Sequence, residues 1–240
     1  MLRINEEPVR TGLSRYFALH EHQRSIIVCE EKKLIYMKPA KTAGTSILRN
    51  SLQKHLPGII HLKDHPEKFQ AWLQKTTDEE LEEYFIFSVV RNPWDRLVSV
   101  ASYLNIPFHD FIHNMQEYRN DPRIRAHSWP LHLYTHYDGN RFVDMICRFE
   151  CLQSDFNLIC DEIGITREKL PFSNKSKHEH YSKYYGDEEY EIVADLYTKD
   201  IAYFGYMFEP EQTLNIETIT ARILARKARN FLLHLPFIRR

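Results

Sequence analysis

The chain has 240 residues, of which 43% are hydrophobic and 13% aromatic, and its formal net charge is −1. This length suits one domain with a full core, and the near-neutral charge argues against a general nucleic-acid-binding protein. No apolar run approaches the roughly 20 residues that span a bilayer, and residues 1–15 lack the apolar segment of a signal peptide. We therefore expect a soluble, cytoplasmic protein without a membrane segment.

The N-terminal part of the chain passes from a polar lead-in to a pair of short strands. Residues 1–25 mix charged and polar side chains, and we expect them to be weakly structured. Residues 26–29 and 34–37 are apolar runs separated by a Glu-Glu-Lys-Lys turn, which predicts two neighbouring strands.

The loop after the second strand is the most informative part of the sequence. A helical pattern follows it over residues 46–55. The backbone N–H groups of such a loop and of the helix start point toward one place, where a lysine adds positive charge. The sequence therefore predicts a site for a phosphate or a phosphate-like group. The residues that form it are Lys41, Thr42, Ala43, Gly44, Thr45 and Ser46.

A second strand-to-helix junction resembles the first. Residues 85–90 predict a buried strand, and Asn92 and Pro93 are typical of a helix cap and a first helical position, which predicts a helix over 93–104. Arg91 ends the strand, and Ser99 lies about two helical turns further on. Two anion sites in one sheet would hold two separated phosphates of one ligand.

The other elements follow from apolar periodicity and from turn residues. They are helices over 66–74 and after Thr77, an irregular segment over 105–131, a hairpin turn at 137–140, a strand near 142–149, a helix over 153–163, a helix from Asp187, and an Arg-rich amphipathic helix over 217–234. Alternating strands and helices predict an α/β fold whose mostly parallel sheet is covered on both faces. We expect residues 1–240 to form a single domain.

The chemistry of the predicted phosphate site differs from that of the P-loop enzymes that hydrolyse nucleoside triphosphates. Their loop ends in Gly-Lys-Ser/Thr, whereas Lys41 here precedes the only glycine of the loop. No convincing strand-terminal Asp for magnesium follows either. A magnesium-dependent kinase is nevertheless an alternative, and a nucleotide- or glycan-binding protein without turnover is a second one.

The two junctions together resemble the carbohydrate-type sulfotransferases, the family that includes the Golgi chondroitin, dermatan and heparan sulfotransferases. Lys-Thr-Ala-Gly-Thr-Ser at 41–46 is followed by Arg-Asn-Pro-Trp-Asp-Arg-Leu-Val-Ser at 91–99. The resemblance covers about 26–208, which leaves the segment 217–240 beyond it. Further segments occur in the family's order at 127–130, 143–144, 148–150, 155–156, 170–176, 184–185 and 204–208.

The resemblance implies a fold like that of the nucleotide kinases, with a P-loop-like phosphate site, but a different donor. This donor is 3′-phosphoadenosine 5′-phosphosulfate (PAPS), used without a metal, and the acceptor is a hydroxyl, most naturally of a carbohydrate. The 41–46 loop would hold the 5′-phosphosulfate, Arg91 and Ser99 the 3′-phosphate, and Lys175 with Ser176 would close over the nucleotide. The chain departs from the family at Ala40, where proline is usual, and at Leu131, where glutamine is frequent.

Sulfuryl transfer needs a base for the attacking hydroxyl and a positive charge at the leaving oxygen. Lys41 is the predicted stabiliser of that oxygen. His65 is the predicted base, because it lies between the two motifs, where heparan-type relatives carry their catalytic histidine, and because the helix start at Pro66 favours its neutral form.

Three further residues have two interpretations each. His127 is the second candidate for the base and also a candidate for acceptor binding. His61 is the third candidate for the base, and its His-x-x-x-His spacing with His65 would suit a metal on a helix, which Pro66 and the preceding loop argue against. Arg96 either contributes to donor or substrate binding or pairs with a neighbour such as Asp95. The sequence names neither the acceptor nor the oligomeric state.

Overall fold

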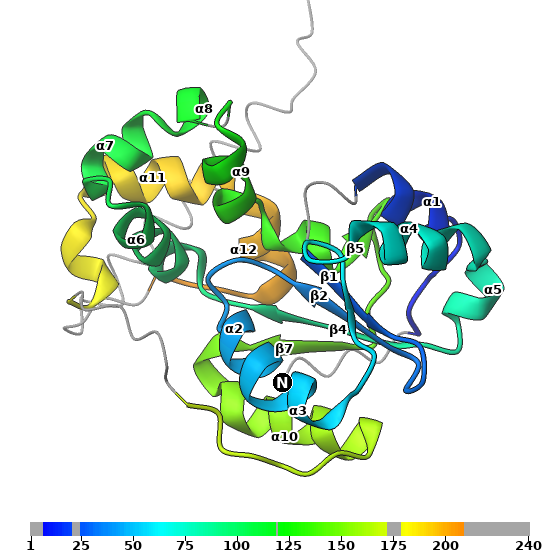
Figure 1. The fold of residues 1–240 in the computed structure, drawn as a ribbon. Coiled ribbons are helices and arrows are strands. Elements are labelled where there is room, and N and C mark those ends of the chain that lie inside the picture. The colour runs from blue at the N-terminus through cyan, green and yellow to red at the C-terminus, as the bar shows by residue number, and fades with distance from the viewer. Residues whose placement is uncertain (1–6, 21–24, 119, 172–178, 209–240) are drawn as a thin grey trace, which may run out of the picture. The chain divides into compact units, whose positions relative to one another are not determined.

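A computed structural model of the chain describes residues 7–20, 25–118, 120–171 and 179–208. Its central sheet has the strand order β3-β1-β2-β4-β7. These strands are β1 (Ser25–Cys29), β2 (Leu34–Lys38), β3 (Ile60–His61), β4 (Phe85–Val90) and β7 (Met145–Arg148). β1 pairs antiparallel with β2 and β3, whereas β2–β4 and β4–β7 are parallel pairs, so four of the five strands share one direction. The predicted mostly parallel α/β sheet is confirmed (Figure 1).

Both faces of this sheet are buried, because successive side chains of a strand point to opposite faces. On β2, Ile35 belongs to one hydrophobic core cluster and Tyr36 to the other. On β4, Ile86 and Phe87 divide in the same way. The rings of Tyr36 and Phe87, which are register partners, stack with centroids 4.4 Å apart. The two clusters explain why these strands are nearly continuous apolar runs.

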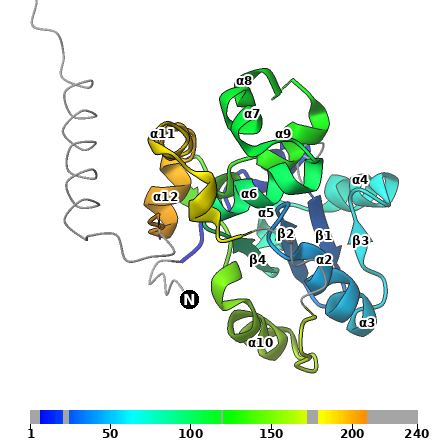
Figure 2. The same ribbon diagram turned by 90° about the vertical axis from the view of Figure 1, so that its left-hand side faces the viewer.

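Helices contribute to both clusters and so cover both faces (Figures 1 and 2). One face packs against α1 (Leu13–His20), α4 (Pro66–Lys75) and α5 (Asp78–Leu81). The other packs against α2 (Gly44–Ile47), the π-helical turn η2 (Leu48–Leu52) and α10 (Leu152–Ile163). Another short helix, α3 (Gln53–His55), continues the helical segment that begins at α2. The predicted three-layer arrangement is therefore confirmed.

Local sequence signals set several element boundaries as predicted. Helix α6 (Pro93–Leu104) begins after Asn92, whose side chain accepts a hydrogen bond from the Trp94 N–H. α5 begins with a capping box between Thr77 and Glu80. The hairpin of β5 (His136–Tyr137) and β6 (Asn140–Arg141) turns through Asp138 and Gly139, with φ values of 50° and 80°.

Two predictions about irregular structure are wrong. The lead-in contains α1, whose Leu13 and Phe17 are fully buried against the sheet. The segment 105–131 contains three short helices, because Pro107 and Pro122 lie at helix starts, where a missing N–H costs nothing. These helices are α7 (Phe108–His113), α8 (Met115–Tyr118) and α9 (Pro122–Ser128).

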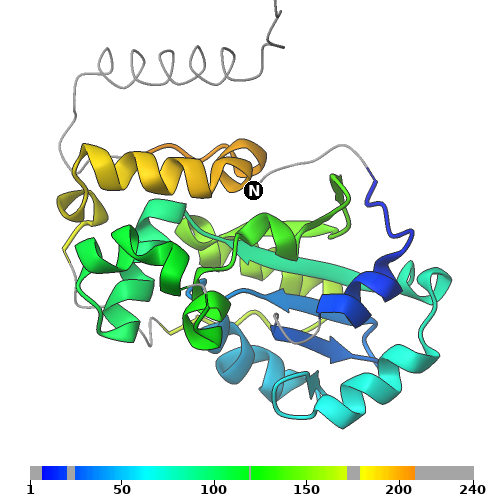
Figure 3. The same ribbon diagram turned by 90° about the horizontal axis from the view of Figure 1, so that it is seen from above.

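The C-terminal part of the described chain also differs in detail. The helix predicted from Asp187 is divided into α11 (Asp187–Leu196) and α12 (Thr198–Phe204), which follow one another along one side of the sheet (Figure 3). The strand predicted near 142–149 is limited to β7. The Arg-rich helix over 217–234 lies outside the described residues, so the single-domain organisation stays a prediction. No helix among the described residues is long and apolar enough to cross a bilayer.

Candidate active site

The predicted phosphate loop connects the end of β2 to the start of α2. Lys41 and Ala43 adopt left-handed conformations, with φ values of 65° and 61°. The Thr42 side chain is buried and donates a hydrogen bond to the Pro39 carbonyl at 3.0 Å. Left-handed geometry is costly for residues with a Cβ and persists only where surrounding contacts stabilise it. Two such residues within three positions show that the chain turns tightly here. Within the described residues, no side chain caps the helix start at Ala43.

Gly44 begins α2 under the side chain of Lys38, the last residue of β2. A Cβ at Gly44 would lie 2.7 Å from Cγ of Lys38, so a larger residue there would force the Lys38 side chain to shift. Burial is the main cause that lowers the pKa of Lys38, and the charge of Lys63 adds to it. Sequence analysis missed Lys38, although a charged residue that ends an otherwise buried strand next to a phosphate loop is a usable signal.

Arg91, at the second strand-to-helix junction, contacts the phosphate loop of the first junction. Its Nη1 donates to the Lys41 carbonyl at 3.0 Å, and its Nε donates to Asp95 Oδ2 at 2.7 Å. Its guanidinium also lies over the Phe149 ring, 4.1 Å from the centroid. The structure thus brings Arg91 and the 41–46 loop together. Ser99 is buried on α6, the helix that follows Arg91.

Arg96 holds the loop in place through hydrogen bonds to backbone carbonyls. It is 0% exposed, its Nε donates to the Ala40 carbonyl at 3.1 Å, and its Nη2 donates to the carbonyls of His127 and Trp129, both at 2.8 Å. The expected alternative of an ion pair with Asp95 is wrong, because Asp95 pairs with Arg91. The prediction that Arg96 contacts substrate is also not supported, because a fully buried guanidinium presents no surface to it. Arg96 is a positioning residue that ties the loop to the end of α9.

Lys41, Tyr103 and His127 form a cluster beside the loop. Lys41 Nζ lies 4.4 Å from the ring centroid of Tyr103, and that ring stacks on His127 with centroids 4.9 Å apart. Burial, followed by the charge of Arg91, lowers the pKa of Lys41. Burial also lowers the pKa of His127, and the charge of Lys41 contributes to that shift. Tyr103 has no local sequence signal for a site, because it is one exposed aromatic on an amphipathic helix.

On the other side of the loop, His61 lies between a hydroxyl and a carboxylate. Its Nε2 is 2.7 Å from Ser25 Oγ, and its Nδ1 is 2.7 Å from Asp64 Oδ2. Burial, with the charges of Lys38 and Lys63, lowers the pKa of His61 despite the opposing effect of its hydrogen bond to Asp64. Because Lys38 also packs on Gly44, this histidine is linked to the phosphate loop through one side chain.

His65, the predicted base, has a different environment. It precedes α4 as predicted, but 47% of its side chain is exposed and its Nδ1 is 4.0 Å from Glu67 Oε1. Among the described residues, no hydrogen bond or ion pair joins His65 to the 41–46 loop, and the same is true of His61. Lys175 and Ser176 lie outside the described residues.

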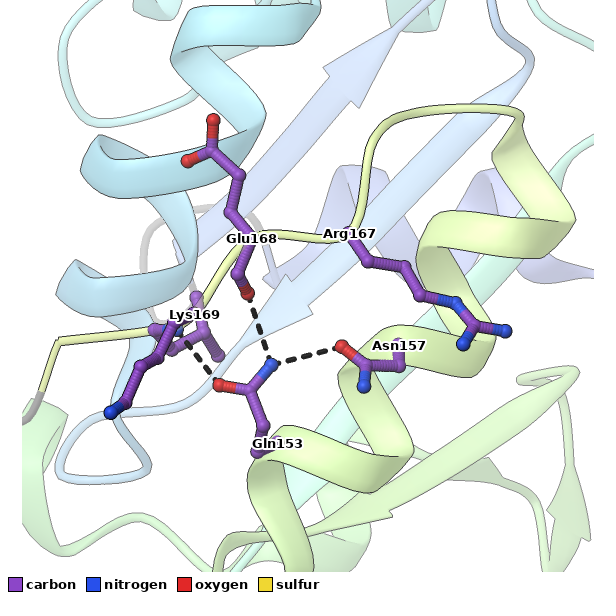
Figure 4. Close-up of a pocket in the computed structure, with 6 residues that line it drawn as sticks. Gln153, Asn157, Arg167, Glu168 and Lys169 are labelled. Atoms are coloured by element: carbon purple, nitrogen blue, oxygen red, sulfur yellow. Dashed lines mark hydrogen bonds between the residues drawn. The ribbon is translucent and has the colours of Figure 1, made fainter.

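A separate surface pocket of about 350 Å³ lies between the first half of α10 and the segment 167–170 (Figure 4). Most of its polar groups form hydrogen bonds with one another. The Gln153 amide donates to Asn157 Oδ1 and the Glu168 carbonyl, and its Oε1 accepts from the Leu170 N–H. These bonds fix the segment after α10, and none of the predicted site residues lines the pocket. We therefore regard it as structural.

Comparison with known proteins shows the family of the chain. A model of the sulfotransferase family matches residues 24–207, so the chain belongs to the sulfotransferase family, as the resemblance predicted. Among solved structures it is similar to a sulfotransferase from Alicyclobacillus acidocaldarius, with 12% sequence identity and a TM-score of 0.33 over 80% of this chain and 87% of that chain. A search of curated proteins gives no match.

Proposed function

We propose that the protein transfers a sulfuryl group from PAPS to a hydroxyl, most naturally the hydroxyl of a carbohydrate. The observation that carries this proposal is the convergence of Lys41, Arg91 and an uncapped helix start on one loop. Burial and the like charge of Arg91 lower the pKa of Lys41, so the charged form of this lysine is destabilised. A bound anion would stabilise that charged form. The chemistry of the loop therefore fits a phosphosulfate group, and family membership supports the same donor.

The residues of the loop divide the work of binding and charge stabilisation. In this proposal, the N–H groups of 44–46 hold the non-bridging oxygens, and Lys41 Nζ stabilises the oxygen that leaves with the phosphate. Arg91 and Ser99 bind the 3′-phosphate, and Asp95 keeps the Arg91 guanidinium oriented. Lys175 and Ser176 are proposed to contact the nucleotide. Positioning and electrostatics would then supply most of the rate enhancement, as in phosphoryl transfer.

We propose His61, in preference to His65, as the general base. Donation of the Nδ1 proton to Asp64 leaves Nε2 as the acceptor of a proton, the arrangement that orients a catalytic imidazole. The lowered pKa keeps the ring neutral at neutral pH, as a base must be. Ser25 Oγ lies at hydrogen-bond distance from Nε2. An acceptor hydroxyl that displaced it would pass its proton to His61 while its oxygen bonds to sulfur and the bond between sulfur and the bridging phosphate oxygen of PAPS breaks.

The donor assignment predicts selective stabilisation by the desulfated nucleotide product. Adenosine 3′,5′-bisphosphate at about 100 times its Kd should add about 2.7 kcal/mol of stability, or roughly 5–10 °C in Tm for a chain of this size. Differential scanning fluorimetry measures this shift, with magnesium-ATP as the comparison because it lacks the 3′-phosphate. A shift with magnesium-ATP and none with the bisphosphate would contradict the assignment.

A further inference from the structure

A second group of chemically reactive side chains lies away from the phosphate loop, between α7 and α11. His109 and His113 are one helical turn apart on α7, and Glu189 projects toward them from α11. α7 lies beside α11 in Figure 1. One ligand atom from each of these three residues lies within 4.8 Å of the others. None of the three takes part in the donor site proposed above.

The distances between these atoms suit a shared ion. Glu189 Oε1 lies 3.0 Å from His113 Nε2 and 3.6 Å from His109 Nε2. The two imidazole rings stack with centroids 4.1 Å apart and 26° between their planes, so each ring must turn about its χ2 bond to aim its Nε2 lone pair at one ion. Ligands about 2.0–2.1 Å from a tetrahedral zinc ion lie roughly 3.3 Å from one another, a value between the two measured distances.

The carboxylate is fixed in place before any ion binds. Glu189 is 8% exposed, and its Oε2 accepts a hydrogen bond from the Gly186 N–H at 2.9 Å in the capping box of α11. This bond occupies Oε2 and turns Oε1 toward the histidines. A buried carboxylate with one oxygen held by the backbone is a preorganised ligand, unlike a solvated surface glutamate.

Two more carboxylates lie near the outer nitrogens of the rings. Glu188 Oε1 is 3.7 Å from His113 Nδ1, and Asp110 Oδ1 is 3.8 Å from His109 Nδ1. Both separations are longer than a hydrogen bond, so these carboxylates act on the rings through their charge. They also make the local potential negative, which favours a cation.

We propose that His109 Nε2, His113 Nε2 and Glu189 Oε1 bind a divalent transition-metal ion, with Zn²⁺ the best match to two imidazoles and one carboxylate. The ion would connect α7 to α11. α7 also packs on Tyr185 through Phe108, with ring centroids 4.7 Å apart, and the Tyr185 hydroxyl donates to the Trp94 carbonyl at the start of α6. Binding would therefore stiffen the helices around α6 and raise thermal stability.

Calorimetric titration of the full chain with zinc chloride tests the proposal. We expect saturable binding, a rise in Tm with Zn²⁺ and none with Mg²⁺, and visible absorption bands of a low-coordinate site when Co²⁺ replaces Zn²⁺. His109→Ala and Glu189→Gln should each weaken binding by more than the roughly 10–100-fold that loss of an outer-shell partner costs. The His109 side chain is 71% exposed, so its removal leaves the fold intact.

His55→Ala is the matched control. His55 Nε2 is 3.0 Å from Glu168 Oε1, the same distance as in the His113–Glu189 pair, and no second histidine completes that site among the described residues. This variant should bind zinc like the unchanged protein. Absence of zinc binding, or equal binding by the unchanged protein and a His109→Ala/His113→Ala double variant, would overturn the proposal.

Discussion

Replacing His61 with glutamine should lower sulfuryl transfer by about 10²–10⁴-fold, the usual contribution of a general base. Glutamine retains hydrogen-bonding groups near Ser25 and Asp64 but cannot take up a proton at neutral pH. Binding of adenosine 3′,5′-bisphosphate should be nearly unchanged, because His61 is linked to the loop only through Lys38. Single-turnover transfer from radiolabelled PAPS, together with the Kd of the bisphosphate, separates the two effects.

The other candidate histidines are the controls for this prediction. His65→Ala should retain most activity, because that side chain is half exposed and has no described contact with the loop. His127→Ala should alter donor or acceptor affinity more than the transfer step, since it stacks on the ring that covers Lys41. An active His61→Gln variant beside an inactive His65→Ala or His127→Ala variant would move the role of base to that residue.

The pH dependence of the transfer step follows from the same assignment. The proposed base works in its neutral form, and its pKa lies below the ordinary histidine value of 6.5. The rate should therefore be constant near neutral pH and fall only when the pH drops through this lowered pKa. Asp64→Asn removes a partner that raises the pKa and fixes the tautomer, so it should shift the acid limb to lower pH and reduce the plateau.

Replacing Lys41 with alanine should have the second large effect. The proposed leaving oxygen loses its positive partner, and removal of one such stabilising group costs about 10²–10³ in kcat. Donor affinity should fall as well, because the ammonium, which lies over the Tyr103 ring, supplies positive charge to the proposed anion site. Steady-state kinetics with PAPS as the varied substrate measures kcat and KM separately.

Lys54→Ala provides the comparison for the loss of a lysine. Lys54 lies further along the same helical segment and pairs with Glu168 at 3.2 Å on the surface. Its replacement should change neither kinetic constant by more than about twofold, since surface ion pairs contribute little. If Lys41→Ala retained the kcat of the Lys54→Ala variant, Lys41 would not act on the leaving group.

Much of the site's framework could be predicted from local sequence. The start of α6 follows from Asn92 and Pro93, whose preferences for a cap and a first helical position act within a few residues. The loop between β2 and α2 follows from an apolar run, a lysine and a glycine. These features predicted where Lys41 and Arg91 lie in the fold. In the structure, Arg91 donates one hydrogen bond to the Lys41 carbonyl.

The choice of His61 over His65 and His127 as the proposed base could not be made from local sequence. His61 is placed by β3, a strand of only two residues whose pairing with β1 brings it to Ser25. Such pairing joins residues far apart in sequence and leaves almost no periodic pattern. The local sequence signal at His65 came from the helix start at Pro66. That signal predicted where the helix begins, and it carried no information about which histidine lies in the active site. Tyr103 and Lys38 likewise gained their significance only from packing.

The central claim is sulfuryl transfer from PAPS, and transfer of the labelled group tests it most directly. The protein is incubated with ³⁵S-labelled PAPS and a panel of unsulfated glycans without added magnesium, and the products are separated. We expect label on at least one glycan, with equimolar release of adenosine 3′,5′-bisphosphate and loss of both in the Lys41→Ala variant. Label that stays on the nucleotide with every acceptor, alongside magnesium-dependent phosphate transfer from ATP, would contradict it.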